Sequence, residues 1–463
     1  MHKLPSAKKN PLITGTLILT LAGLISRGIG FVYRLFLSQA FGEEGMGLLQ
    51  LVSPVMMIAF SLTGAGMQTA ISRYTASCAA CSRPETAHRY LLAGSSFCLL
   101  LSSVYALIVY GQADFIALHL LKDARLSSLL KIIAFTFPLS AVHCCLNGYF
   151  YGLKEVRIPS FCQLAEQLTR TGSAFLLYLA LSSRGKPTIA LAALGMVLGE
   201  LVSCIISYMA YRSLYAPYGK KRLFFPKKAK LSSGRRGGIP SAPLSGTDSG
   251  FSLLGQLLGM TLPLSLNRLI VNLLQSLEAV SIPQKLQEFG YSTQTALSIY
   301  GVLTGMAFSL VLFPSAFTQS ASVLLLPEVT QAAASSARER MKHTIHRSLL
   351  ASGILGIFFG CVFFFFGSWA GEFLFHSRLA GAFIRQLSFL CPFLYLHATL
   401  SSILHGLKKT GLSLCINVTT LLIRLLFTLT LIPTVGIKGY LWGLLCSELF
   451  SSGCHFWLIK RNV

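Results

Sequence analysis

Twelve apolar stretches, each of membrane-spanning length, follow one another along this chain of 463 residues. About 20 apolar residues suffice to cross a bilayer as a helix, and a chain in lipid must satisfy its backbone hydrogen bonds internally. With a mean hydropathy of +0.64 and only 12% charged residues, the sequence predicts an all-α polytopic membrane protein. The predicted segments are 12–37, 46–72, 88–111, 127–152, 157–183, 187–212, 251–276, 296–327, 346–371, 381–406, 410–432 and 437–459.

The charged residues favour one orientation of these segments. The chain holds 39 lysines and arginines against 15 aspartates and glutamates, a net charge of +24. Most of the cations lie at the two ends and in alternate loops, on one side of the predicted membrane. Because basic loops stay on the cytoplasmic side, we expect a plasma-membrane protein with both termini in the cytoplasm. Because the cations lie mostly in short loops between apolar segments, their distribution argues against a nucleic-acid partner.

The largest predicted loop, residues 213–250, is basic and rich in glycine, serine and proline. Such a composition predicts a disordered cytoplasmic linker. It divides the chain into an N-terminal lobe, residues 1–212, and a C-terminal lobe, residues 251–463. Its cations act as an orientation signal, and they can also attract anionic membrane lipids.

The two lobes contain an internal repeat. Pro138, His143 and Arg170 recur with identical spacing as Pro392, His397 and Arg424. In the same order, Glu200 corresponds to Glu448 and Arg27 corresponds to Arg268. Each half starts on the cytoplasmic side, so the repeat predicts two pseudo-symmetric six-helix lobes related by an axis along the membrane normal. In transporters built this way the substrate site lies between the halves.

Two arginines lie within the first apolar segment, residues 12–37. Arg27 and Arg34 are seven residues apart and therefore share one face of a helix, together with Gly23 and Gly30. An arginine at membrane depth usually faces a bundle interior or a water-filled cavity. We therefore expect this face to form one wall of a cavity that binds an anion. Alternatively, Arg34 extends to the outer membrane interface.

The seventh segment contributes two further candidates, Asn267 and Arg268. The repeat predicts that Arg27 and Arg268 face each other across the pseudo-axis. We therefore assign Arg27, Arg34, Asn267 and Arg268 as the predicted substrate-binding residues.

Other polar residues at membrane depth are candidates for ion coupling or for joining helices. Glu166 precedes Arg170 by four residues, the favourable order for a pair within one helix. Arg424 occupies the corresponding position of the C-terminal lobe, and Glu200 and Glu448 are single acids in the sixth and twelfth segments. Each of these residues either carries a coupling ion, H⁺ or Na⁺, or holds helices together. No other cofactor, no metal and no catalytic residue is predicted.

The N-terminal region, residues 15–73, resembles a known family. It contains a leading GTLILT, an SR-x-x-G-F-x-YR pattern at 26–34, a G-x-E-G-M-G-L turn at 42–48 and a following Q-L-x-x-P. These motifs are similar to the stage V sporulation protein B group, in the polysaccharide-exporter branch of the multidrug/oligosaccharidyl-lipid/polysaccharide flippase superfamily. The resemblance, looser but continuous to the end of the chain, implies two six-helix lobes and alternating access.

The same resemblance implies a substrate and a role. Members of the group are expected to move a lipid-linked cell-wall intermediate across the plasma membrane during formation of spore cortex peptidoglycan. Related flippases use central-cavity arginines, which Arg27, Arg34 and Arg268 match by position. Multidrug members typically carry an acid on the first helix, and none lies between residues 12 and 37.

The sequence thus predicts a flippase, and not an enzyme, for an undecaprenyl-pyrophosphate-linked saccharide such as a peptidoglycan precursor. Arginine presents planar donors that suit phosphate oxygens. One alternative is an ion-coupled multidrug exporter of the same superfamily, which predicts an acidic cavity. Another is a membrane scaffold for cell-wall synthesis enzymes, which are also candidate partners of a flippase. A general 12-helix facilitator would carry G-x-x-x-D-R-x-G-R-R in loop 2–3, which this sequence lacks.

Overall fold

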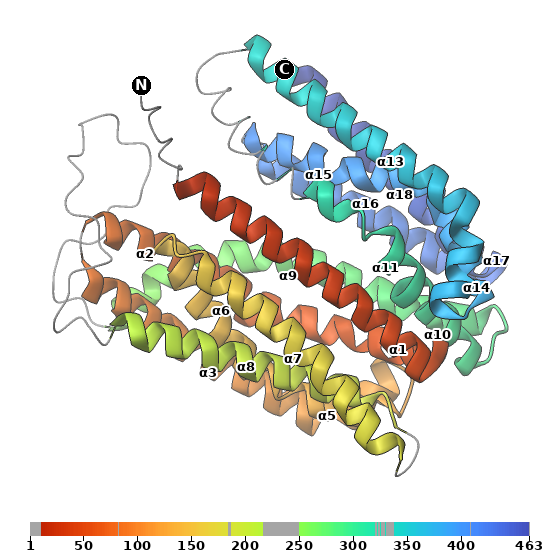
Figure 1. Cartoon of the computed structure of the whole chain (residues 1–463), viewed down its shortest axis with the longest axis horizontal. Coiled ribbons are helices and arrows are strands. Elements are labelled where there is room, and N and C mark those ends of the chain that lie inside the picture. Colours follow the sequence, from red (N-terminus) through yellow and green to blue (C-terminus); the bar gives the residue numbers. More distant parts are fainter. Residues whose placement is uncertain are drawn as a thin grey trace, which may run out of the picture.

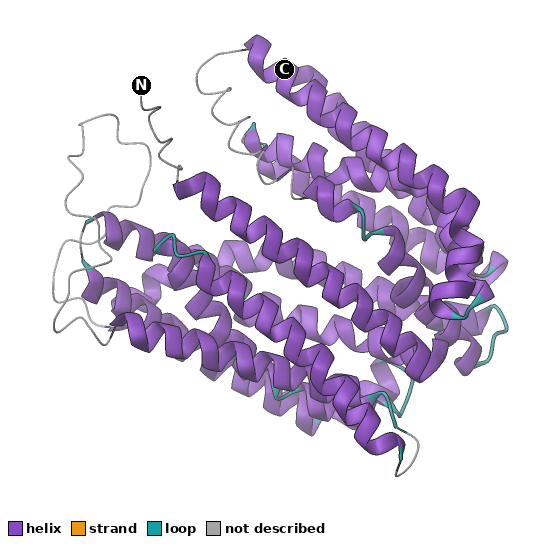
Figure 2. Cartoon of the chain, viewed as in Figure 1, coloured by secondary structure: helices purple, strands orange, loops and turns teal. Residues whose placement is uncertain are grey.

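The computed structural model describes residues 11–81, 83–183, 187–215, 250–319, 322, 325, 329, 338–407 and 409–462. Throughout these residues the regular structure is helical, with no strand (Figure 2). The all-α prediction is therefore confirmed. Most of the predicted linker, residues 216–249, lies outside the described residues, so the proposed division of the chain there stays a prediction.

The N-terminal half forms one long helix and eight helical segments packed around it. α1 (Pro11–Thr63) contains the first predicted segment, 12–37, and most of the second, 46–72, on either side of a bend at Gly42, where φ is 69°. Glycine adopts this left-handed conformation without the steric penalty that a side chain would add. The remaining elements are α2 (Ala65–Ala80), α3 (Pro84–Gly111), α4 (Ala113–Phe115), η1 (Ile116–Leu120), α5 (Leu126–Ile133), α6 (Thr136–Gly152), α7 (Arg157–Ser182) and α8 (Ala190–Tyr215).

The C-terminal half repeats this plan with more interruptions. Its elements are α9 (Gly250–Glu288), α10 (Thr293–Gly301), η3 (Val302–Ala307), α11 (Phe308–Val311), α13 (Arg338–Phe375), α14 (Arg378–Leu387), η4 (Ser388–Leu390), α15 (Cys391–Gly406), α16 (Thr410–Thr430), α17 (Ile432–Val435) and α18 (Ile437–Asn462). α9 extends well beyond the predicted segment 251–276, and this extension brings an acid into the membrane region that the sequence interpretation missed.

The helix lengths agree with twelve crossings. In the described part of the chain, nine helices are long and apolar enough to span a membrane, and the first of these, Ile18–Ala80, contains two segments separated by the bend at Gly42. α7 and α18 have 26 residues each, enough to span, but polar residues lower their hydropathy. The chain is therefore a multi-pass membrane protein.

The two halves meet at one end of the molecule and separate at the other. A single hydrophobic core joins helices of both halves at the end near Leu37, Met46, Leu303 and Met306, which we call the closed end. Toward the opposite end the core divides into one cluster within α2, α3, α6 and the start of α9, and another within α13, α15 and α18. The ribbons accordingly diverge toward the end where α1 begins and α18 ends (Figure 1).

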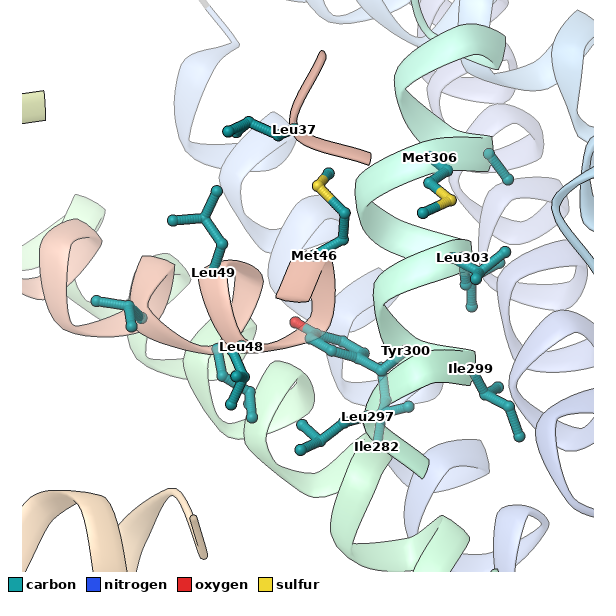
Figure 3. Packing of buried hydrophobic residues seen from close by; sticks show 14 of the residues in the cluster. Leu37, Met46, Leu48, Leu49, Ile282, Leu297, Ile299, Tyr300, Leu303 and Met306 are labelled. Carbon is teal, nitrogen blue, oxygen red and sulfur yellow. The ribbon is translucent and has the colours of Figure 1, made fainter. Parts of the chain in front are cut away.

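Backbones approach closely at the closed end. A Cβ added to Gly301 would lie 2.3 Å from the Gly47 nitrogen, and one added to Gly47 would lie 2.2 Å from the Leu297 carbonyl oxygen. Only glycine permits this spacing between α1 and α10. Around this glycine seam, Met46 of α1 lies beside Tyr300 and Met306, in a cluster that also includes Leu49 and Leu303 (Figure 3). The seam and its apolar surroundings close the molecule at this end.

Candidate functional site

A cavity of 480 Å³ lies between the two halves. Its walls come mainly from α1, α7 and the segment 308–319. Three arginines, Arg27, Arg34 and Arg170, line it, and its described lining includes no carboxylate. Leu37, Met46 and Leu49 also line it and belong to the core of the closed end. The cavity is therefore a cationic chamber that ends at the apolar junction of the two halves.

Helix α1 supplies two of the three cavity arginines. Arg27 and Arg34 both line the chamber, as expected from their shared helix face. The Arg27 guanidinium donates a hydrogen bond to the Gln319 side chain, across the interface between the halves. α1 is held against α7 at Gly30, where an added Cβ would lie 2.7 Å from the Gln167 amide nitrogen.

The third arginine, Arg170, comes from α7 and is paired with an acid. Its guanidinium forms the predicted i, i+4 ion pair with Glu166. The pair lies where α8 packs against α7 through Gly195 and Gly199. A Cβ added to these glycines would lie 2.8 Å from the Arg170 carbonyl oxygen and 2.9 Å from the Glu166 carbonyl oxygen, respectively. This small-residue packing brings α8 to within side-chain reach of Glu166.

Close packing of α8 on α7 places Glu200, the residue after Gly199, beside Glu166. One carboxylate oxygen of each acid and a ring nitrogen of His143 lie within 4.8 Å of one another. The His143 Nδ1 atom is 3.4 Å from a Glu200 oxygen, and its Nε2 atom is 2.7 Å from the Asn147 amide nitrogen. An amide nitrogen donates, so Nε2 accepts and the Nδ1 proton points toward Glu200. Side chains from α6, α7 and α8, namely His143, Glu166 and Glu200, thus form one cluster next to Arg170, which we call the acidic cluster.

The corresponding arginine of the C-terminal half has different partners. Arg424 on α16 pairs with Glu278 on α9, with Nε 2.6 Å from one carboxylate oxygen and Nη2 2.8 Å from the other. The Tyr440 hydroxyl donates to the same carboxylate at 2.9 Å. Glu278 is only 4% exposed. These contacts join α9, α16 and α18 in the protein interior.

Glu278 was missed in the sequence because the predicted seventh segment ended at residue 276. The signal that could have revealed it is its separation from Arg268 by ten residues on one continuous helix, with no proline or glycine between them. Extending the seventh predicted segment beyond residue 276 would have placed Glu278 at membrane depth, as an acid that could pair with Arg424.

The remaining acid, Glu448 on α18, is 7% exposed. Its Oε2 atom has no hydrogen-bond partner in the described part of the chain. Nearby, Ser451 lies 3.2 Å from the His397 ring nitrogen. Glu448 therefore lies apart from the cationic chamber, among buried polar groups of the C-terminal half.

The structure does not place Asn267 and Arg268 with the cavity arginines. Both are exposed residues on α9, and neither belongs to the described lining of the 480 Å³ cavity. Arg268 interacts electrostatically with Cys144 of α6. A second cavity of 320 Å³, lined mainly by α1 and α6, also includes Glu200 of α8 and Asn272 of α9 in its lining. The chamber combines Arg27 with Arg34 and Arg170. That Arg27 and Arg268 face each other across the pseudo-axis stays a prediction.

Comparison with protein families agrees with this architecture. Residues 12–318 match the model of the family described as polysaccharide biosynthesis protein, and residues 289–430 match the MatE model. The chain belongs to the polysaccharide biosynthesis protein family. Together with the relatives below, these matches identify a flippase of the multidrug/oligosaccharidyl-lipid/polysaccharide superfamily, a transporter and not an enzyme.

Two characterised relatives from Bacillus subtilis (strain 168) span most of the chain. "Stage V sporulation protein B" is 27% identical over 93% of this chain and 80% of its own length. "Lipid II flippase MurJ" is 21% identical over 97% of this chain and 83% of its own length. Among solved structures, an inward-facing multidrug resistance MATE family transporter shares the fold with a TM-score of 0.70 at 14% identity, covering 96% of this chain and 98% of its own.

Proposed function

We propose that this protein moves a lipid-linked anionic saccharide, carried on undecaprenyl pyrophosphate, across the plasma membrane. The observation that carries the proposal is the charge of the chamber: three arginines and no carboxylate in its described lining. Arginine binds phosphate oxygens through paired, charge-assisted hydrogen bonds. A cationic drug would instead be repelled by such a wall, which counts against the multidrug alternative.

The shape of the molecule supports alternating access. The chamber ends at the apolar closed end, where the two halves share a core, and the halves diverge toward the end where α1 begins and α18 ends. Described cations gather at the helix ends there, among them Lys154, Arg157, Arg212, Lys409 and Arg461. By the positive-inside rule this is the cytoplasmic end, where a lipid-linked precursor would enter. Similarity to a sporulation protein and to a lipid II flippase supports a peptidoglycan precursor used during sporulation as the substrate.

Binding of lipid II to the purified protein in nanodiscs tests the proposal. We expect the wild type to bind lipid II, and Arg27→Gln and Arg34→Gln each to weaken binding by about 1.5–3 kcal/mol, the range for a hydrogen bond to a charged group. Arg378→Gln is the matched control, because Arg378 lies at the surface, where its side chain is 92% exposed. Lipid II binding that ignores both cavity arginines, combined with binding of a cationic dye, would identify a multidrug exporter.

A further inference from the structure

Arg170 belongs to two sites at once. It lines the cationic chamber, and it is also bonded to Glu166, a member of the acidic cluster with His143 and Glu200. A guanidinium that is fully engaged by a carboxylate offers less charge to an incoming anion. Whatever changes the charge of the acidic cluster therefore changes what Arg170 offers to the chamber.

The cluster carries an excess negative charge that one proton would remove. Glu166 and Glu200 contribute two negative charges and Arg170 contributes one positive charge. His143 is the third member of the cluster, with its Nδ1 atom 3.4 Å from a Glu200 oxygen. Two carboxylates that approach this closely repel each other, and a single proton between them relieves the repulsion. The proton would be a property of the carboxylate pair and not of one residue alone.

Apart from Arg170 and His143, no basic side chain forms an ion pair with Glu166 or Glu200 within the described residues. Other ionisable groups that interact electrostatically with the cluster or its members come from four helices: Tyr33 of α1, Cys144 of α6, Cys162 of α7 and Cys204 of α8. Arg34 lines the same chamber, and Arg268 acts on Cys144. Within the described residues, Arg170 is the one cation that forms an ion pair with Glu166.

An unused donor beside Arg170 points to an anion at this place. Tyr33 lines the chamber and is 5% exposed, yet its hydroxyl has no hydrogen-bond partner among the described residues. The Arg170 Nε atom likewise makes no hydrogen bond there. Buried donors are normally satisfied, and pyrophosphate oxygens are acceptors. Both atoms are covered in this conformation, so these two donors, from α1 and α7, would suit an anion once Arg170 has turned from Glu166 into the chamber.

We propose that a proton bound by the Glu166–Glu200 pair releases Arg170 to a pyrophosphate group in the chamber, so that the proton and the anion bind together. This inference rests on the proposed function. Its consequence is a direction of coupling: the anion binds more tightly as pH falls. In an exporter of cations the proton would compete with the substrate, and the dependence on pH would be reversed.

Proton uptake on binding tests the coupling. The probes are farnesyl pyrophosphate and inorganic pyrophosphate, titrated calorimetrically into the full-length protein in nanodiscs, in buffers of different ionisation enthalpy between pH 6 and 8. We expect the wild type to take up about one more proton per bound probe than Glu166→Gln does. At pH values above the pKa of the carboxylate pair, the Kd of the wild type should rise by up to about tenfold per pH unit. The probe's own protonation is common to both proteins and cancels in the comparison.

Variants separate the partners of this linkage. In Glu166→Gln, Arg170 is free at every pH, so binding should be tight and lack the extra proton. Arg170→Gln should weaken binding and also abolish the extra proton. Glu288→Gln is the matched control because Glu288 is a surface residue paired with Lys285, and it should behave as the wild type. If Glu166→Gln does not fold, Glu200→Gln, which should also lose the extra proton, provides the test.

Failure of the linkage and failure of the proposed function are distinguishable. If the wild type binds farnesyl pyrophosphate with the same proton uptake as Glu166→Gln, the linkage is overturned while the flippase proposal stands. If the wild type binds neither probe at any pH and also fails to bind lipid II, the proposed function itself is overturned. Tighter binding of farnesyl pyrophosphate than of inorganic pyrophosphate would assign the site to a lipid-linked group, the source that we expect.

Discussion

Arg170 and Arg424 occupy equivalent positions of the internal repeat, and the two halves of the molecule use them differently. Arg170 lines the chamber, and its acid, Glu166, also approaches a second acid and a histidine. Arg424 donates a hydrogen bond through Nη2 to the deeply buried Glu278, its Nε atom lies 2.6 Å from the other carboxylate oxygen, and Glu278 also accepts from Tyr440. The repeat has therefore preserved the cation, and Arg424 also interacts electrostatically with Glu448 and His397, the counterparts of Glu200 and His143. The directly bonded acid has diverged, giving one arginine that a ligand can reach and one that joins three helices.

The largest expected effect comes from breaking the buried pair. Glu278→Gln leaves Arg424 charged in the interior, and removing one partner of a buried ion pair typically costs about 3–5 kcal/mol. We expect a marked fall in the thermal unfolding midpoint of the detergent-solubilised protein. Glu166→Gln should cost much less, because Arg170 faces the chamber. Equal losses of stability in the two variants would contradict the contrast between the halves.

A double replacement sharpens this prediction. Replacing both partners, as in Glu278→Leu with Arg424→Met, removes the uncompensated charge, and such replacements are often neutral or stabilising. The double variant should therefore recover much of the stability lost by Glu278→Gln. Failure to recover would show that this site depends on the charges themselves.

An intermediate effect is expected from the glycines that set helix spacing. Gly199→Ala would place a Cβ 2.9 Å from the Glu166 carbonyl oxygen, and overpacking of this kind costs about 1–3 kcal/mol. By moving α8 from α7 it should also separate Glu200 from Glu166 and reduce the extra proton uptake. Gly443→Ala, which meets the Phe427 side chain at 2.6 Å, should destabilise the protein similarly but leave proton uptake unchanged. Loss of proton uptake in both variants would show that general loosening is the cause.

The smallest effect concerns two tyrosine hydroxyls. Tyr440→Phe removes one hydrogen bond to Glu278 and should lower the free energy of unfolding by about 0.5–1.5 kcal/mol. Tyr33→Phe removes a buried hydroxyl with no partner in the described part of the chain, so stability should be unchanged or slightly higher. Binding of farnesyl pyrophosphate should nevertheless weaken in Tyr33→Phe and not in Tyr440→Phe. The reverse pattern would assign the ligand to the C-terminal half.

Sequence reasoning predicted the fold and part of the contrast between Arg170 and Arg424. The apolar segments and the repeat indicated the helical architecture and the equivalence of Arg170 with Arg424. The i, i+4 spacing indicated the Glu166–Arg170 pair, because such pairs are local. Glu278 lies 146 residues from Arg424, so no local spacing could reveal that contact. The grouping of Arg170 with Arg27 and Arg34 likewise depends on how α1 and α7 pack, which the repeat alone does not specify.

The glycine seam at the closed end has a consequence for the transport cycle. Gly47 and Gly301 have no side chains to order, so forming or separating this contact changes little side-chain conformational entropy. The balance between closed and open forms would then be set by the few polar contacts beside it, such as those from Gln294 to Glu44 and from Ser377 to Glu43. Single polar substitutions at these contacts would therefore shift the equilibrium between the closed and open forms without changing the apolar junction itself.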